Sequence, residues 1–232
     1  MRLIRVIIAV FLLPCCAAVA RAVYFTLAVP AGGGGFGGTS FFWTALGLGF
    51  LLWMLFFVFL PAPVRSYVLA HELTHVLWGA LMGASVLGMR VSKSGGEVKL
   101  SESNLFIALA PYFFPFYTLL LAAAWFLASV FLDLRAYFPL FLGATGFTLG
   151  FHICFTISAL GRRQPDTAQY GRFFSYTLIC FMNLLVIGLL LILVSPVSFN
   201  QFAGRLAVDF GIVGNFIWGW MRQLYGAVPR RL

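Results

Sequence analysis

Charge is scarce in this chain. Of its 232 residues only 9% are charged and only six are acidic, whereas about a quarter of the residues in an ordinary soluble domain carry a charge. Hydrophobic residues make up 62% of the chain, and its mean hydropathy is +1.00. These values exclude an ordinary soluble domain, so the sequence predicts a protein that has the lipid bilayer as its solvent.

Long polar segments are also absent. The longest, residues 88–103, has sixteen residues, which is too few for a domain of its own. The apolar runs are each near or above the ~20 residues that a spanning helix needs, and they occupy residues 4–20, 41–60, 66–84, 104–132, 138–160 and 176–195. We therefore expect an all-α polytopic membrane protein with about six transmembrane helices, folded as one domain over residues 1–232 with a core at about 64–185.

Cysteine is represented by only four residues, and no two of them form a Cys-x-x-Cys pair. Cys15 and Cys16 are adjacent, while Cys154 and Cys180 fall within different apolar runs. This spacing gives no sign of a disulfide framework or of a thiolate metal or redox site. We interpret the four cysteines as thiols embedded in the membrane.

Acidic residues are outnumbered by 15 lysines and arginines, which give the chain a formal net charge of +9. Most of the basic residues lie between the apolar runs, where the phosphate groups of lipids can reach them. No basic run is interleaved with aromatic residues in the manner of a nucleic-acid-binding surface. The expected partner is therefore the lipid bilayer with its anionic headgroups, and not nucleic acid.

Both ends of the chain have the composition of membrane-associated segments. Residues 1–22 combine a basic start, an apolar run and small residues. They fit an uncleaved first helix, the interpretation that we favour, or a cleavable signal peptide. The tail, residues 196–232, holds a short apolar run at 206–221 with Trp218 and Trp220 inside it and arginines beyond it, which favours an interfacial helix over a seventh span.

Histidine occurs only three times, yet two of the three stand in the sequence His71-Glu72-Leu73-Thr74-His75. Chance would place such an HExxH motif in roughly one chain of this composition in a thousand. On a helix, a separation of four residues puts both imidazoles on one face, so that both can bind one metal ion. The motif predicts a zinc site at His71 and His75, with Glu72 beside the remaining coordination position as the base that deprotonates water.

A catalytic zinc ion usually takes three protein ligands, so the two histidines need a partner elsewhere. Glu97 and Glu102 follow the motif at a separation like that of soluble zinc proteases whose third ligand is a glutamate. Asp166 stands in a helix-breaking stretch, residues 161–171, where an unwound backbone can aim a carboxylate inward, and we favour it. The alternative for Asp166 is a solvated acid paired with a nearby arginine, namely Arg162, Arg163 or Arg172.

His152 competes with Asp166 for this role. It lies in the apolar run 138–160, where a neutral histidine needs a polar partner such as a metal ion. If the runs 104–132 and 138–160 each cross the membrane once, the helix that carries the motif enters the membrane from the face opposite Asp166. Only a bent path or a broken helix would then bring the motif and Asp166 together. His152 needs less bending, but as a single histidine in an apolar run it also fits a hydrogen-bonded core residue.

Two backbone features follow the motif. Residues 88–103 alternate partly between polar and apolar side chains around Gly95-Gly96, which predicts a short β-hairpin. The hairpin is either a plain surface feature or a strand edge that holds an extended substrate beside the metal. Pro111 and Pro115 predict a kink near the start of the run 104–132, which either makes room for substrate or water or only shapes the helix.

An HExxH motif on a membrane helix, a glycine-containing hairpin and a carboxylate 95 residues after His71 together resemble the site-2 protease family of intramembrane zinc metalloproteases. The resemblance covers residues 64–185. It implies a core of three membrane helices, with His71, His75 and Asp166 as zinc ligands and Glu72 as general base. The chain has no inserted regulatory domain, and Gln164-Pro165-Asp166-Thr167 stands where the family usually has Leu-Asp-Gly, so it would be a minimal and divergent member.

These expectations define an intramembrane zinc metalloprotease of the cell membrane. It would hydrolyse peptide bonds of a membrane-anchored protein or peptide substrate with a zinc-activated water molecule, and Glu72 would take the proton and later give it to the leaving amine. The alternative is a non-proteolytic zinc-binding membrane protein that acts as a client-binding scaffold. The substitution Glu72→Gln separates the two, because a scaffold tolerates it and a protease does not.

Overall fold

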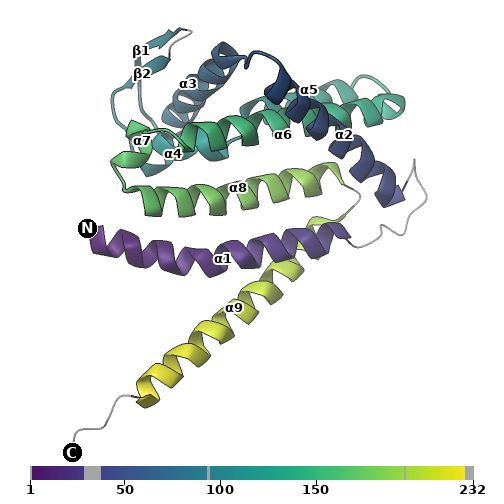
Figure 1. The fold of residues 1–232 in the computed structure, drawn as a ribbon. Coiled ribbons are helices and arrows are strands. Elements are labelled where there is room, and N and C mark those ends of the chain that lie inside the picture. Colours follow the sequence, from purple (N-terminus) through teal and green to yellow (C-terminus); the bar gives the residue numbers. More distant parts are fainter. Residues whose placement is uncertain (1, 29–37, 93–94, 196, 228–232) are drawn as a thin grey trace, which may run out of the picture. The chain divides into compact units, whose positions relative to one another are not determined.

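The structure of this chain, a computed structural model, describes residues 2–28, 38–92, 95–195 and 197–227 (Figure 1). The chain forms two compact units. The first unit contains both ends of the chain, residues 1–31 and 180–232, and the second contains residues 32–179. The expected core at 64–185 therefore falls mainly within the second unit.

The second unit holds most of the helices and the one small sheet of the described residues. Its elements are α2 (Gly38–Phe59), α3 (Val64–Leu81), β1 (Val86–Val91), β2 (Gly96–Leu100), α4 (Leu105–Phe113), α5 (Phe116–Ser129), the short 3₁₀ helix η1 (Arg135–Tyr137), α6 (Phe138–Leu160) and α7 (Pro165–Ala168). The boundary between the units lies within α8 (Arg172–Val194), after Ile179.

Helices α2 and α6 pack at close range because glycines lie at their interface. A Cβ atom on Gly49 of α2 would overlap the backbone carbonyl of Gly143 in α6, and one on Gly146 would overlap the carbonyl of Leu46. Small residues of this kind let two membrane helices approach backbone to backbone, which increases their van der Waals contact. Further along the interface, the Trp53 ring packs against Phe151, with ring centroids 4.9 Å apart.

The predicted hairpin is present. Strands β1 and β2 pair antiparallel, with Val91 opposite Gly96 and Met89 opposite Val98. Of the predicted segment, Lys93 and Ser94 lie outside the described residues. Strand β2 contacts α3, because the Leu100 side chain lies 2.9 Å from the position of a Cβ atom on Gly79.

The proline-rich run 104–132 forms two helices, α4 and α5, which are bent by 75° relative to each other. The break falls at Phe114 and Pro115. Proline has no N–H group to donate and holds the residue before it in an extended conformation, and Phe114 accordingly has φ −101° and ψ 102°. The predicted kink is thus a full break at Pro115, while Pro111 lies inside α4.

Four described helices are long and apolar enough to cross a membrane, or five if the bent α4–α5 pair counts as one span. The four lie at Arg2–Thr26, Phe41–Phe59, Arg135–Leu160 and Arg172–Val194. The chain is therefore a helical membrane protein, with four or five such segments where about six are expected. The remaining expected span, 66–84, coincides with α3, which falls outside this group because it carries the polar HExxH residues.

The first unit contains α1 (Arg2–Ala28), the later part of α8, and α9 (Phe199–Ala227). Asp209 of α9 has a side chain that is fully buried and ion-paired with two arginines. Its carboxylate lies 3.3 Å from Nε of Arg21 in α1 and 3.0 Å from Nε of Arg205 in α9. Both guanidinium groups also lie over the ring of Phe25. Helix α9 is not among the candidate spans, and the interfacial placement of the tail stays a prediction.

Candidate metal centre

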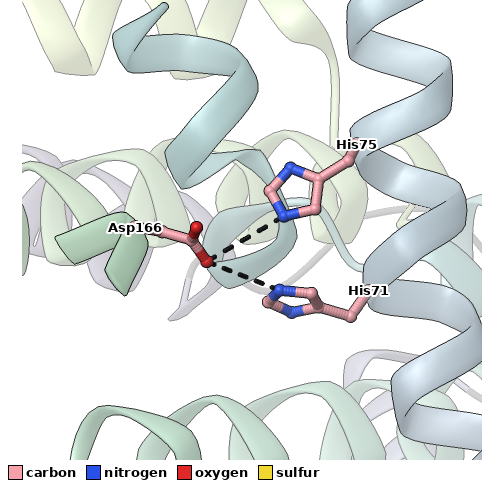
Figure 2. Close-up of side chains that lie close together, drawn as sticks. All are labelled: His71, His75 and Asp166. Atoms are coloured by element: carbon pink, nitrogen blue, oxygen red, sulfur yellow. Dashed lines mark ion pairs between the residues drawn. The ribbon is translucent and has the colours of Figure 1, made fainter. Parts of the chain in front are cut away.

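Helix α3 carries both histidines of the motif on one face, as the spacing predicts (Figure 2). Their imidazole ring centroids are 4.9 Å apart, and the rings are nearly perpendicular. Each side chain is 13% exposed, so neither is sealed in the protein interior. The two rings therefore offer neighbouring nitrogen atoms at a half-buried site.

Asp166 lies opposite these rings, in the first turn of the short helix α7 (Figure 2). Its Oδ2 atom is 3.6 Å from Nε2 of His71 and 3.9 Å from Nε2 of His75. Taken together, one ligand atom of each residue lies within 4.8 Å of the other two. Ligand atoms around a tetrahedral zinc ion are about 3.4 Å apart, so the three residues fit one ion with small shifts of their side chains.

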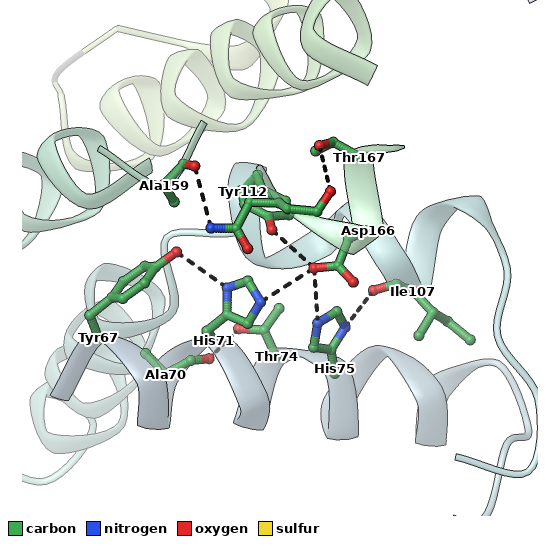
Figure 3. Close-up of polar contacts among 11 residues, drawn as sticks. Tyr67, Ala70, His71, Thr74, His75, Ile107, Tyr112, Ala159, Asp166 and Thr167 are labelled. Atoms are coloured by element: carbon green, nitrogen blue, oxygen red, sulfur yellow. Dashed lines mark hydrogen bonds and ion pairs between the residues drawn. The ribbon is translucent and has the colours of Figure 1, made fainter. Parts of the chain in front are cut away.

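Hydrogen bonds fix the orientation of each of these three side chains (Figure 3). Nδ1 of His75 lies 2.9 Å from the carbonyl oxygen of Ile107, which can only accept, so Nδ1 carries the proton and Nε2 faces Asp166. The Tyr112 hydroxyl donates to Oδ2 of Asp166 at 2.9 Å, and the Tyr67 hydroxyl lies 3.4 Å from Nδ1 of His71. Partners of this kind set the tautomer and the ring orientation of metal-binding histidines.

The segment that carries Asp166 is held by hydrogen bonds of its own. The Gln164 amide donates to the carbonyl of Ala159, and the Thr167 hydroxyl donates to the carbonyl of Gln164 (Figure 3). Ser175, at the start of α8, donates its hydroxyl to the Thr167 carbonyl at 3.1 Å. The helix-breaking stretch is thus a fixed turn that aims Asp166 at α3.

Asp166 is poised to be ionised. Burial alone would raise the pKa of its carboxyl, but the hydrogen bond with His71, the charges of the two histidines and the Tyr112 hydroxyl outweigh burial and hold that pKa below its ordinary value. None of its ion pairs within the described residues involves Arg162, Arg163 or Arg172, the partners of the alternative interpretation. Its contacts are instead with His71, His75 and Tyr112.

Glu72 lies on α3 between the two histidines and is 5% exposed. Burial raises the pKa of its carboxyl, and the nearby carboxylates of Asp166 and Glu97 act in the same direction against the lowering effect of His71. The backbone of Gly96 in β2 lies against this side chain, since a Cβ atom there would be 2.6 Å from Oε1 of Glu72. The hairpin therefore closes one side of the site at Glu72.

The site opens into a cleft with a volume of about 740 Å³. The cleft is lined by both motif histidines, Glu72 and Asp166 together with the beginning of β2 and the end of α6. A volume of this size belongs to the range of ordinary ligand pockets. The three candidate ligands and the candidate base thus face one shared space.

The other candidate ligands of the sequence do not join this group. Among the described residues, His71, His75 and Asp166 are the one cluster of three that could hold a metal ion. His152 is 8% exposed and lines, together with His71, a separate cavity of about 20 Å³. Glu97 lines the cleft from β2, and Glu102 is exposed in the segment between β2 and α4. All four cysteines are free thiols, as expected.

Three contributors to the site were not predicted from the sequence, namely Tyr67, Tyr112 and the Ile107 carbonyl. Tyr67 precedes His71 by four residues, and on a helix this spacing alone could have placed it on the same face. Tyr112 and Ile107 come from α4, and no local pattern indicates that α4 lies beside α3. Asn104 helps to position them, because its side chain caps α4 by accepting from the N–H groups of Phe106 and Ile107.

The fold and the site define a class of protein: a helical membrane protein with a His-His-Asp cluster and a buried glutamate on one cleft. Comparison with protein-family models, with curated proteins and with solved structures finds no significant match. The functional argument therefore rests on the chemistry of this chain's own residues.

Proposed function

We propose that this chain is a membrane zinc metalloprotease similar to the site-2 protease family. His71, His75 and Asp166 hold the zinc ion, and Glu72 is the general base. The observation that carries the proposal is the approach of Oδ2 of Asp166 to Nε2 of both histidines, at 3.6 and 3.9 Å. Two helical imidazoles alone are a weak signal, but a carboxylate oriented toward both of them completes the ligand set of a catalytic zinc site.

When bound at these residues, zinc would polarise a peptide carbonyl and increase the acidity of a water molecule. Glu72 is placed to accept a proton in this reaction, since it lines the same cleft as the three ligands. The same carboxyl then donates that proton to the leaving amine.

The hairpin supports a peptide as the substrate. Gly95, Gly96, Glu97 and Val98 line the cleft, and the sheet has two strands, so an outer edge of β2 has no strand partner in the described sheet. An extended peptide can add to such an edge through its backbone hydrogen bonds. A membrane-anchored helix would have to unwind there first, because its amide groups are occupied within the helix.

The first test is the zinc content of detergent-purified protein, measured by elemental analysis. We expect about one zinc per chain in the wild type, loss of zinc in His71→Ala and in Asp166→Ala, and retained zinc in the control His152→Ala. The control is matched, because His152 is also a buried histidine beside His71 but lies outside the cluster. Loss of zinc in His152→Ala with retention in Asp166→Ala would contradict the proposed ligand set.

The second part of the test separates a protease from a scaffold. Glu72→Gln should keep the zinc ion and abolish cleavage of membrane-anchored reporter segments that the wild type cleaves. If Glu72→Gln cleaves as fast as the wild type, the proposed mechanism fails. If neither protein cleaves any reporter although both hold zinc, the result favours the client-binding scaffold.

A further inference from the structure

A cationic side chain, that of Arg162, lies at the same cleft as the candidate metal centre. Arg162 follows α6 directly and lines the cleft together with His71, Glu72 and Asp166. Its backbone is fixed, because its N–H donates to the carbonyl of Ala159 at 3.0 Å in the last turn of the helix. The side chain therefore starts from a defined position at the wall of the cleft.

Among the described residues, no carboxylate lies within ion-pair distance of the Arg162 guanidinium. Glu72, Glu97 and Asp166 line the same cleft, yet none of them lies within ion-pair distance of Arg162. The nearest aspartate in sequence, Asp166, is committed to the two histidines and Tyr112.

The surroundings of Arg162 favour a strong interaction with an anion. Phe57, Tyr67 and Phe155 line the same cleft, and the rings of Tyr67 and Phe155 are stacked with centroids 4.7 Å apart. Apolar walls lower the local dielectric constant and strengthen an ion pair. A guanidinium also presents a planar fork of N–H groups that matches both oxygens of a carboxylate.

We propose that Arg162 is a specificity-determining residue that binds a carboxylate of the substrate in the cleft. This inference rests on the proposed peptidase function and goes further, because it assigns the substrate a negative charge at one defined place. The carboxylate is either an acidic side chain near the scissile bond or the free C-terminus of the peptide. Glu72, Glu97 and Asp166 also line the cleft and would repel a second negative charge on the substrate. The preference for a carboxylate should therefore hold at one substrate position and not at every position.

Arg163 is a matched control. It is the next residue, it is also exposed, and its removal changes the net charge by the same amount, but it does not line the cleft. If Arg162 served only to anchor the end of α6 among lipid headgroups, as arginines beside membrane helices do, Arg163 would be expected to behave in the same way. Comparison of the two positions therefore separates substrate recognition from membrane anchoring.

The probes are fluorescent peptides of eight alanine and leucine residues with one central position varied. One carries aspartate and a C-terminal amide, one carries asparagine and an amide, one carries asparagine and a free carboxylate, and one carries lysine and an amide. Binding to detergent-solubilised protein is measured by fluorescence anisotropy with and without added zinc. Because binding without zinc is recorded, the readout does not depend on catalysis.

The wild type should bind one of the two carboxylate peptides about tenfold more tightly than the neutral peptide, as a charge-assisted bidentate contact predicts. Which of the two binds identifies a side-chain or a terminal carboxylate. Arg162→Gln should abolish this preference, and Arg163→Gln should keep it. Arg162→Glu should instead favour the lysine peptide, a gain of binding that misfolding cannot produce.

Two results overturn the proposal. One is the absence of a carboxylate preference in the wild type, including a complete absence of binding. The other is an Arg162→Gln variant that keeps the preference, or that loses it only to the same extent as Arg163→Gln. Failure of the proposed function has a different signature, because neither the wild type nor Glu72→Gln would then cleave a reporter, while the carboxylate preference and its dependence on Arg162 remain.

Discussion

At the scale of single residues, the centre depends on hydrogen bonds that the motif does not contain. The Ile107 carbonyl holds the proton of His75 on Nδ1, which leaves Nε2 free to bind a metal ion. Tyr112 orients Asp166 in a similar way, because its hydroxyl donates to the same Oδ2 atom that faces both histidines. Loss of a group that orients a ligand in this way typically lowers metal affinity or activity by about 10- to 100-fold.

Tyr112→Phe should therefore lower zinc affinity by about tenfold, because outer partners of metal ligands typically contribute 10- to 100-fold. The substitution removes only the hydroxyl and keeps the buried ring, so the fold should be unaffected. Affinity is measured by competition with a chelator of known strength. Tyr117→Phe is the control, since the Tyr117 hydroxyl donates to the Ser66 carbonyl and not to a candidate ligand. Equal affinity in Tyr112→Phe and the wild type would contradict this role.

The sequence predicts part of this centre and not the rest. His71, Glu72 and His75 are predictable because their relative positions follow from helix geometry alone. Asp166 is predictable as a candidate, since a carboxylate in a helix-breaking stretch is free to point inward, but its selection over His152 depends on tertiary structure. The role of Tyr112 cannot be predicted from the sequence, because its position beside His71 depends on the packing of α4 against α3.

At the scale of elements, the hairpin packs closely against the motif helix α3 at two glycines, Gly96 and Gly79. Gly96 of β2 lies directly against Glu72, and a Cβ atom there would be 2.6 Å from both Cγ and Oε1 of that side chain and 2.7 Å from Val68. Gly79 accommodates Leu100 in the same manner at the other end of β2. The position of Glu72 thus depends on the close approach of a strand that follows it by more than twenty residues.

Gly96→Ala should reduce peptide cleavage strongly while zinc content remains near that of the wild type. The added methyl group must either displace the Glu72 carboxyl or push β2 away from α3, and overpacking of this kind costs about 1–3 kcal/mol of folding free energy. Zinc content and cleavage of a reporter are measured on the same preparation. Gly88→Ala is the matched hairpin control, because a Cβ atom on Gly88 meets nothing within 4 Å. Equal cleavage by both variants would show that the close approach is not needed.

At the scale of the whole molecule, one apolar run does not always correspond to one crossing. Hydropathy alone predicts a span at 104–132, but the chain breaks there by 75° between α4 and α5. The order of the expected spans places the motif and Asp166 at opposite faces of the membrane, so that a bent path or a broken helix is needed to bring them together. The break between α4 and α5 is such a broken helix. Hydropathy measures length and composition, so it detects the apolar run but not the break. The count of four or five spans in place of six therefore depends on how this broken pair is counted and on α3, whose polar motif residues keep it out of the group.

Local sequence patterns likewise cannot predict the first unit, because it is formed by two segments from opposite ends of the chain. Arg21 and Asp209 are 188 residues apart in sequence, and each alone reads as an isolated charge near an apolar run. Their pairing explains how a fully buried carboxylate is tolerated in α9. The association of α1 with α9 should therefore depend on the charges around Asp209.

This dependence gives a prediction for the two units. The double substitution Arg21→Met and Arg205→Met leaves Asp209 buried without a cation, a change that typically costs about 3–5 kcal/mol. We expect α9 to become sensitive to limited proteolysis, and we expect Asp209→Leu, added to the double variant, to restore protection, because an apolar replacement removes the unpaired charge. The zinc content is the control, since all three candidate ligands belong to the second unit. Protection of α9 in the double variant would refute the role of the buried ion pairs, whereas a parallel loss of zinc would show that the second unit depends on the first.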